Sequence, residues 1–212
     1  MMRILRIICS SGFSGSGVCR PVRRKIMTIK KRAAFIGEGM VELRGSPFGE
    51  MSQYYGGDTV NTASYLARLG KAFTEVNFVT AVGTDDLSNG MVERMQADGI
   101  RTSFVMRDEK RQPGLYMIKL DEKGERSFQY WRVDSAARAM FRHKQFSQIS
   151  EQLQYSDLIY LTAISVAILM DNDRRHLRAL LGKARQNNAQ VVFDSNYRPS
   201  LWQIFLRQGG GI

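Results

Sequence analysis

Short apolar runs that alternate with helical segments constrain the fold of this chain more than any other feature. The apolar runs occupy residues 33–37, 76–82, 158–161 and 190–193, and the helical patterns occupy residues 60–69, 86–98 and 171–187. Strands without polar alternation are buried on both faces, which is typical of a parallel sheet covered by helices. The sequence therefore predicts an α/β fold with a parallel central sheet. Thr59 can cap the first helix and Gly70 can end it.

An excursion from this alternation lies at 113–132, where PGLYMIKL and RSFQYWR flank the turn DEKGE. Two extended segments around a glycine-containing turn predict a β-hairpin. Aromatic rings pack on the C–H faces of sugars, and an arginine binds carboxylates. Tyr116, Tyr130 and Arg132 therefore suit an acidic, sugar-like ligand. The aromatic face of the hairpin could instead pack on a partner subunit.

The basic residues of the chain are unevenly distributed. The net charge of the 212 residues is +11, yet residues 1–32 hold nine of the 31 basic residues and no acidic one. The remainder is nearly balanced, so the charge does not indicate a nucleic-acid partner. No run approaches the ~18–20 apolar residues that cross a membrane. The length suits one domain.

Residues 1–32 are expected to be a basic leader outside the folded domain. Arg6 interrupts its short apolar run, which excludes a signal peptide. We expect the true start at Met27, and an organellar transit segment is the alternative. Both cysteines lie in this leader, and His143 and His176 are expected to be solvated or capping residues. The sequence therefore predicts no metal site built from histidine or cysteine.

The segment GEGMVE at 37–42 follows a strand and looks like the start of a dinucleotide fingerprint. That fingerprint needs a third glycine where this chain has Glu42. A carboxylate there would repel a pyrophosphate. The segment is therefore not interpreted as a dinucleotide site.

The segment GGDTVNTA at 56–63 places two glycines before a helix. Glycines let a ligand approach the backbone, while Asp58 accepts hydrogen bonds and Asn61 both donates and accepts them. A sugar needs this mixture of groups. The alternative is a tight turn in which Asp58 is only a local cap.

A third polar segment, DSNYRP at 194–199, follows the last predicted strand. Ligands of open parallel sheets bind at the carboxyl ends of the strands, and Arg198 could bind a phosphate or carboxylate there. The alternative is a helix-entry loop in which Asp194 and Asn196 bind backbone groups.

These segments, in this order, resemble the ribokinase-like (PfkB) family of sugar kinases. The resemblance is carried by FIGEGMVEL, GGDTVNTASYLARLG, PGLYMIKLDEKGERSFQYWR, LTAISVAIL and FDSNYRPSLW, and it covers residues 33–202. It is closest to the branch that phosphorylates 2-dehydro-3-deoxygluconate. The resemblance implies a ribokinase-like three-layer fold whose hairpin at 113–132 is a lid.

The resemblance also implies roles for individual residues. The substrate-binding residues would be Gly57, Asp58, Asn61, Tyr116, Tyr130, Arg132 and Arg198. Arg132 would read the acid group of the sugar. ATP with Mg²⁺ would be the phosphoryl donor, with Asn196 and Arg198 on its side of the site. The lid hairpin could pair subunits into a homo-oligomer, and the expected location is the cytoplasm, with no nucleic-acid or membrane partner.

The chain departs from the family in lacking its C-terminal D-T-x-G-A-G-D-like motif. That motif supplies the catalytic aspartate and the anion hole, so no catalytic residue is assigned here. We expect a fold truncated on the C-terminal side, a non-family tail at 203–212, and no kinase activity from these residues alone. The alternatives are an inactive sugar-acid-binding fragment and a different PfkB sugar kinase, such as a fructokinase.

Overall fold

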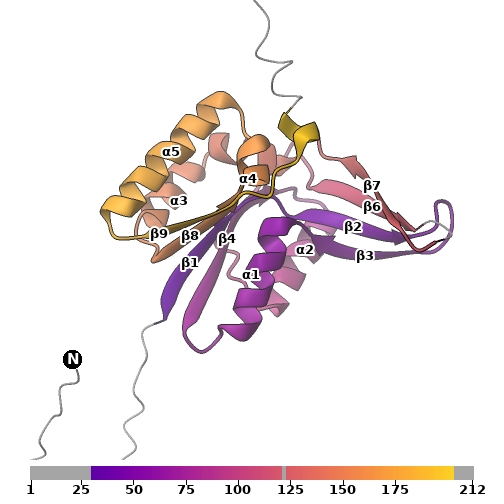
Figure 1. Cartoon of the computed structure of the whole chain (residues 1–212), viewed down its shortest axis with the longest axis horizontal. Coiled ribbons are helices and arrows are strands. Elements are labelled where there is room, and N and C mark those ends of the chain that lie inside the picture. Colours follow the sequence, from indigo (N-terminus) through magenta and orange to yellow (C-terminus); the bar gives the residue numbers. More distant parts are fainter. Residues whose placement is uncertain (1–29, 121–122, 203–212) are drawn as a thin grey trace, which may run out of the picture.

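A parallel sheet forms the centre of the computed structural model, which describes residues 30–120 and 123–202 (Figure 1). Its strand order is β5-β4-β1-β8-β9, and every neighbouring pair is parallel. The strands are β1 (Lys31–Ile36), β4 (Thr74–Val82), β5 (Val105–Arg107), β8 (Leu158–Thr162) and β9 (Gln190–Asp194). The predicted parallel sheet is confirmed. The short strand β5 was not predicted.

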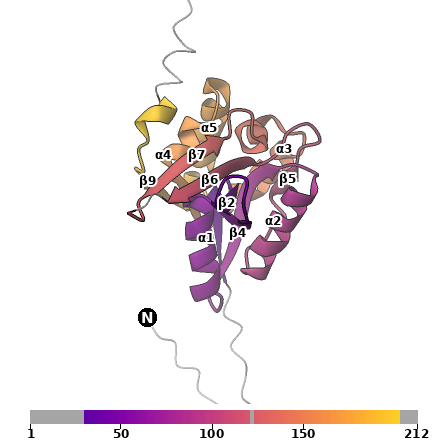
Figure 2. The same cartoon turned by 90° about the vertical axis from the view of Figure 1, so that its right-hand side faces the viewer.

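Helices cover both faces of this sheet, which gives three layers (Figures 1 and 2). One face carries α1 (Asp58–Leu69) and α2 (Asp86–Ala97), and the other carries the 3₁₀ helix η1 (Ala136–Arg142), α3 (Phe146–Leu153) and α5 (Asp171–Gln186). The short helix α4 (Ala163–Ala167) follows β8.

The sheet separates two hydrophobic cores. Ala33 and Phe35 of β1 pack with α1 and α2, whereas Ala34 and Ile36 pack with η1, α3 and α5. Successive residues of a strand point to opposite faces, so a strand buried on both must be apolar throughout. This is the physical reason for the uninterrupted apolar runs in the sequence.

A second, four-stranded sheet projects from the side of the central one (Figure 1) and is here called the lid. Its order is β3-β2-β6-β7, from β2 (Met40–Gly45), β3 (Met51–Gly56), β6 (Gly114–Leu120) and β7 (Arg126–Trp131). The predicted hairpin is confirmed as the antiparallel pair β6–β7, in which Tyr116 faces Tyr130. The pair β2–β3 was missed because polar residues interrupt its apolar pattern.

Two expectations about the first helix have different outcomes. Gly70 ends α1, as predicted. The prediction that Thr59 caps the helix is wrong: the N-cap is Gly57, and Thr59 is buried inside the first turn with its hydroxyl 3.2 Å from that of Ser165. The close approach of α1 to α4 takes Thr59 away from the capping position.

The predicted tail and residues 1–29 of the predicted leader lie outside the described residues. Of the rest of the leader, Lys30 is exposed, and Lys31 and Arg32 already belong to β1. Within the described ranges, no helix combines the length and the apolar character needed to cross a membrane.

The turn before α1 generates a stability prediction. Gly57 has a φ of 141°, and a Cβ on it would lie 2.6 Å from the carbonyl oxygen of Glu38. Gly57→Ala should therefore reduce the free energy of unfolding by about 1–3 kcal/mol. The matched control is Gly182→Ala in α5, where a Cβ meets nothing within 4 Å; it should add about 0.5–1 kcal/mol. Urea unfolding measures both, and equal effects would contradict the prediction.

Candidate functional site

The predicted ligand segments meet at the carboxyl edge of the central sheet. The Nδ2 of Asn196, just after β9, donates to Oδ2 of Asp58 at 3.0 Å, across 138 residues of sequence. Asp194 accepts a hydrogen bond from the hydroxyl of Tyr160 at 3.1 Å. The structure therefore brings GGDTVNTA and DSNYRP together at the place where open parallel sheets bind ligands.

Asp58 makes the local contact expected of a turn and a long-range contact to Asn196 that the sequence did not predict. Its Oδ1 accepts from the backbone N–H of Thr59 at 2.8 Å, which is the local contact of a turn. Its Oδ2 accepts from Asn196, so both oxygens are held in place. The carboxylate is only half-buried and keeps further lone pairs for a ligand hydroxyl.

Asn61 lies elsewhere on the first turns of α1. It lines a cavity of about 450 Å³ together with Tyr55 of β3 and Arg68 and Asp98, and neither Gly57 nor Asp58 borders that cavity. In the cavity, the hydroxyl of Tyr55 donates to Asp98, and burial together with this bond raises the pKa of Tyr55 to about 12. Asn61 therefore borders a cavity that Asp58 does not, although the two residues lie within one turn of α1.

Arg132 makes a buried ion pair that the sequence did not reveal. Its Nη2 donates to Glu38, and the side chains are 11% and 1% exposed. Glu38 also accepts a hydrogen bond from the hydroxyl of Ser135. Within the described part of the chain, the buried Nε of Arg132 has no partner, so one donor of the guanidinium stays unused.

The aromatic face of the lid rests on a second buried carboxylate. The hydroxyl of Tyr116 donates to Glu42, and burial together with this bond raises the pKa of Tyr116 well above its usual range. A Cβ on Gly56 would lie 2.4 Å from that hydroxyl, so only glycine leaves room for it. The Tyr116 and Tyr130 rings lie 5.8 Å apart. Glu42, the residue that excluded a dinucleotide site, therefore holds the lid tyrosine.

The residues predicted on the nucleotide side differ in their surroundings. The backbone N–H of Asn196 donates to Oδ1 of Asp194 at 3.0 Å, as a helix-entry loop would require. Arg198 is exposed, and its guanidinium makes no hydrogen bond or ion pair with the described residues. An exposed guanidinium fits a phosphate group by charge and by geometry.

The described residues give no ready-made cage for a metal ion. Among residues 30–120 and 123–202, no group of three or more His, Cys, Asp and Glu side chains is gathered. Mg²⁺ in kinase sites is usually held by one or two carboxylates together with substrate phosphates. The donors present therefore fit Mg²⁺ only as a companion of a bound nucleotide.

The Glu38–Arg132 pair generates a second prediction. Glu38→Ala should reduce the free energy of unfolding on the order of 3–5 kcal/mol, because Arg132 would then be a buried cation without a partner. The double variant Glu38→Ala, Arg132→Met should lose less than the sum of the two single losses, by at least about 1 kcal/mol. Urea unfolding of the four chains measures this coupling. Additive losses would mean that the two side chains do not depend on each other.

Comparison with known proteins was made at the level of family, sequence and structure. The pattern of the pfkB family carbohydrate kinase matches residues 32–209. The chain is 53% identical to 2-dehydro-3-deoxygluconokinase of Haemophilus influenzae over 173 residues, which are 81% of this chain and 55% of that protein. It is 42% identical to the 2-dehydro-3-deoxygluconokinase of Escherichia coli K12 over 82% of this chain and 56% of that protein. The chain therefore spans about half the length of these curated relatives.

Solved structures show the same fold. The 2-dehydro-3-deoxygluconokinase of Thermotoga maritima superposes with a TM-score of 0.69 at 22% identity, covering 82% of this chain and 53% of that one. A fructokinase of Xylella fastidiosa with bound ATP gives a TM-score of 0.66 at 26% identity, covering 82% of this chain and 51% of that one. The ribokinase-like fold expected from the sequence is confirmed. The chain belongs to the pfkB family of carbohydrate kinases.

Proposed function

We propose that this chain carries the sugar-acid side of a kinase site of the 2-dehydro-3-deoxygluconokinase type. The whole protein's reaction would be the ATP-dependent phosphorylation of 2-dehydro-3-deoxygluconate to its 6-phosphate, in the cytoplasm. The observation that carries the proposal is the buried Arg132, which lies beside the aromatic face of the lid and whose Nε has no hydrogen-bond partner among the residues that the structure describes. A guanidinium in this setting suits a ligand that is both a sugar and an acid.

The residues divide the work of binding between the sheet edge and the lid. Asp58, held by Asn196, would accept hydrogen bonds from sugar hydroxyls. Tyr116 and Tyr130 would cover the C–H face of the sugar, and Arg132 would bind its carboxylate. Closing the aromatic face over the sugar would exclude water, which strengthens each of these polar contacts. Gly57 and Asn61 stay proposals as sugar-binding residues.

ATP, when bound, supplies the phosphoryl group, and Mg²⁺ neutralises its charge. Arg198 would bind the phosphates, because its exposed guanidinium is free of contacts with the described residues. Asn196 would lie on the same side. The catalytic aspartate motif of the family is not in this sequence, so we expect these 212 residues to bind the acid without phosphorylating it.

The second candidate is a kinase of a neutral sugar. A fructokinase of Salmonella typhimurium is 28% identical over 79% of this chain and 52% of that protein. A neutral sugar offers no charge to Arg132, whose guanidinium would then be only a structural partner of Glu38. We therefore favour the acid. Pairing of subunits through the lid also stays a proposal, in keeping with the exposed Phe128 and Trp131.

Ligand binding to the 212-residue chain tests the proposal. Isothermal titration should show that 2-dehydro-3-deoxygluconate binds at least tenfold more tightly than D-fructose. Arg132→Met should remove this preference, because hydrogen bonds to charged groups are worth about 1.5–3 kcal/mol. Arg132→Lys, which keeps the charge but not the planar fork, should lose part of it.

Arg126→Met is the matched control for these variants, since Arg126 is an exposed arginine at the start of β7, the strand that ends just before Arg132. It should keep the preference for the acid. If the wild-type chain binds both sugars equally, the acid-kinase proposal is wrong. If both Arg132 variants keep the preference, Arg132 is not the group that reads the acid.

A further inference from the structure

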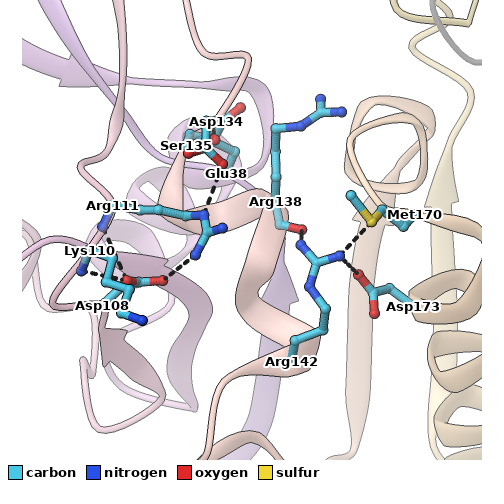
Figure 3. A network of polar contacts seen from close by, with 10 residues as sticks. All are labelled: Glu38, Asp108, Lys110, Arg111, Asp134, Ser135, Arg138, Arg142, Met170 and Asp173. Atoms are coloured by element: carbon cyan, nitrogen blue, oxygen red, sulfur yellow. Dashed lines mark hydrogen bonds and ion pairs between the residues drawn. The ribbon is translucent and has the colours of Figure 1, made fainter. Parts of the chain in front are cut away.

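The 3₁₀ helix η1, which begins next to Glu38, carries a further arginine, Arg138 (Figure 3). Ser135, just before η1, donates its hydroxyl to Glu38. The backbone N–H of Arg138 donates to the carbonyl of Ser135 at 3.1 Å, which closes a 3₁₀ turn. Side chains three residues apart in such a turn lie on the same side of the helix. The side chain of Arg138 therefore leaves η1 on the side of Ser135 and Glu38.

Arg138 differs from Arg111 and Arg142 in having no ion-pair partner among the described residues. Arg111 pairs with Asp134 at 2.9 Å, and Arg142 pairs with Asp173 at 3.4 Å. The guanidinium of Arg138 is half-buried, makes no hydrogen bond or ion pair within the described ranges, and stands without a contact line in Figure 3.

The carboxylates near Arg138 are already bound by other side chains, so the surroundings of its guanidinium are positively charged. Burial lowers the pKa of Arg138; the charge of Glu38 opposes this shift, while those of Arg132 and Arg142 add to it. Asp134 also acts on it, but it is largely exposed and bound to Arg111. The carboxylate of Glu38 is already bound by Arg132 and Ser135. Arginine stays protonated in proteins, so a half-buried guanidinium in these surroundings is stabilised by any anion that reaches it.

We propose that Arg138 is a second substrate-binding guanidinium, which binds the carboxylate of the sugar acid together with Arg132. This inference rests on the proposed function and adds a specificity residue to it. Two guanidiniums and the carboxylate of Glu38 carry a net charge of +1, which matches a monoanion such as a sugar carboxylate better than a phosphate dianion.

Titration calorimetry on the full 212-residue chain tests this role. Arg138→Met should weaken the binding of 2-dehydro-3-deoxygluconate at least tenfold and leave the binding of D-fructose within twofold of the wild type. The affinity of Arg138→Lys for 2-dehydro-3-deoxygluconate should lie between those of the wild type and of Arg138→Met. The control is Arg175→Met, because Arg175 is an exposed arginine of α5 whose side chain donates to Asn172 at 3.2 Å. Arg175→Met removes the same charge from another helix, and it should leave the affinity for 2-dehydro-3-deoxygluconate within twofold of the wild type.

Inorganic phosphate is the third ligand, and it separates the two possible sources of the anion. If Arg138→Met weakens phosphate binding and leaves acid binding unchanged, Arg138 serves a phosphate and the inference is wrong. Urea unfolding of each variant shows that the chain remains folded. If Arg138→Met does not fold, Arg138→Lys becomes the deciding variant, because its ammonium cannot form the bidentate fork of a guanidinium. The inference is then overturned if Arg138→Lys binds the acid as tightly as the wild-type chain does.

The outcomes also separate this inference from the proposed function. A wild-type chain that does not prefer the acid overturns both. A wild-type chain that prefers the acid and loses the preference in the Arg132 variants, but not in Arg138→Met, overturns the role of Arg138 alone. Loss of the preference at both positions, with Arg175→Met unchanged, supports both.

Discussion

The buried carboxylate of Glu38 is the contact on which the candidate site depends. It lies two residues after the end of β1, and its carboxylate accepts hydrogen bonds from Arg132 at the base of the lid and from Ser135 at the start of η1. Its backbone carbonyl lies beneath Gly57. One residue thus ties the lid, the second face of the sheet and the start of α1 to the central strand. A carboxylate that is 1% exposed is tolerated only when it is paired. The position of the lid base and the burial of Glu38 therefore depend on each other.

A second carboxylate organises the lid itself. Glu42 lies four residues further along and holds the hydroxyl of Tyr116, while Gly56 of the neighbouring strand leaves room for that hydroxyl. Both glutamates of GEGMVE thus orient protein side chains. This explains how a segment that resembles a phosphate-binding turn can carry two acidic groups: their charges are used within the protein, by Arg132 and by a tyrosine.

The sequence allowed the central sheet, its parallel direction and the lid hairpin to be predicted, because apolar runs and turn residues are local signals. The pair β2–β3 was not predictable in this way, since Val41 and Glu42 become buried only when β6 joins them. The contact between Asp58 and Asn196 was not predicted, although it lies at the carboxyl ends of the strands, where the sequence placed both segments. The pair Glu38–Arg132 does not follow from any local signal, because 94 residues separate its members and the pairing requires a docked lid.

The balance of charge at the base of the lid suggests how an acid would be selected over a neutral sugar. Glu38 compensates one guanidinium, and the half-buried guanidinium of Arg138 has no ion-pair partner among residues 30–120 and 123–202. A neutral sugar closing over this region would remove water from an uncompensated cation, which carries a desolvation penalty. A sugar acid would supply the missing charge in the same step. Discrimination would then arise as much from the penalty imposed on the wrong ligand as from the contacts made to the right one.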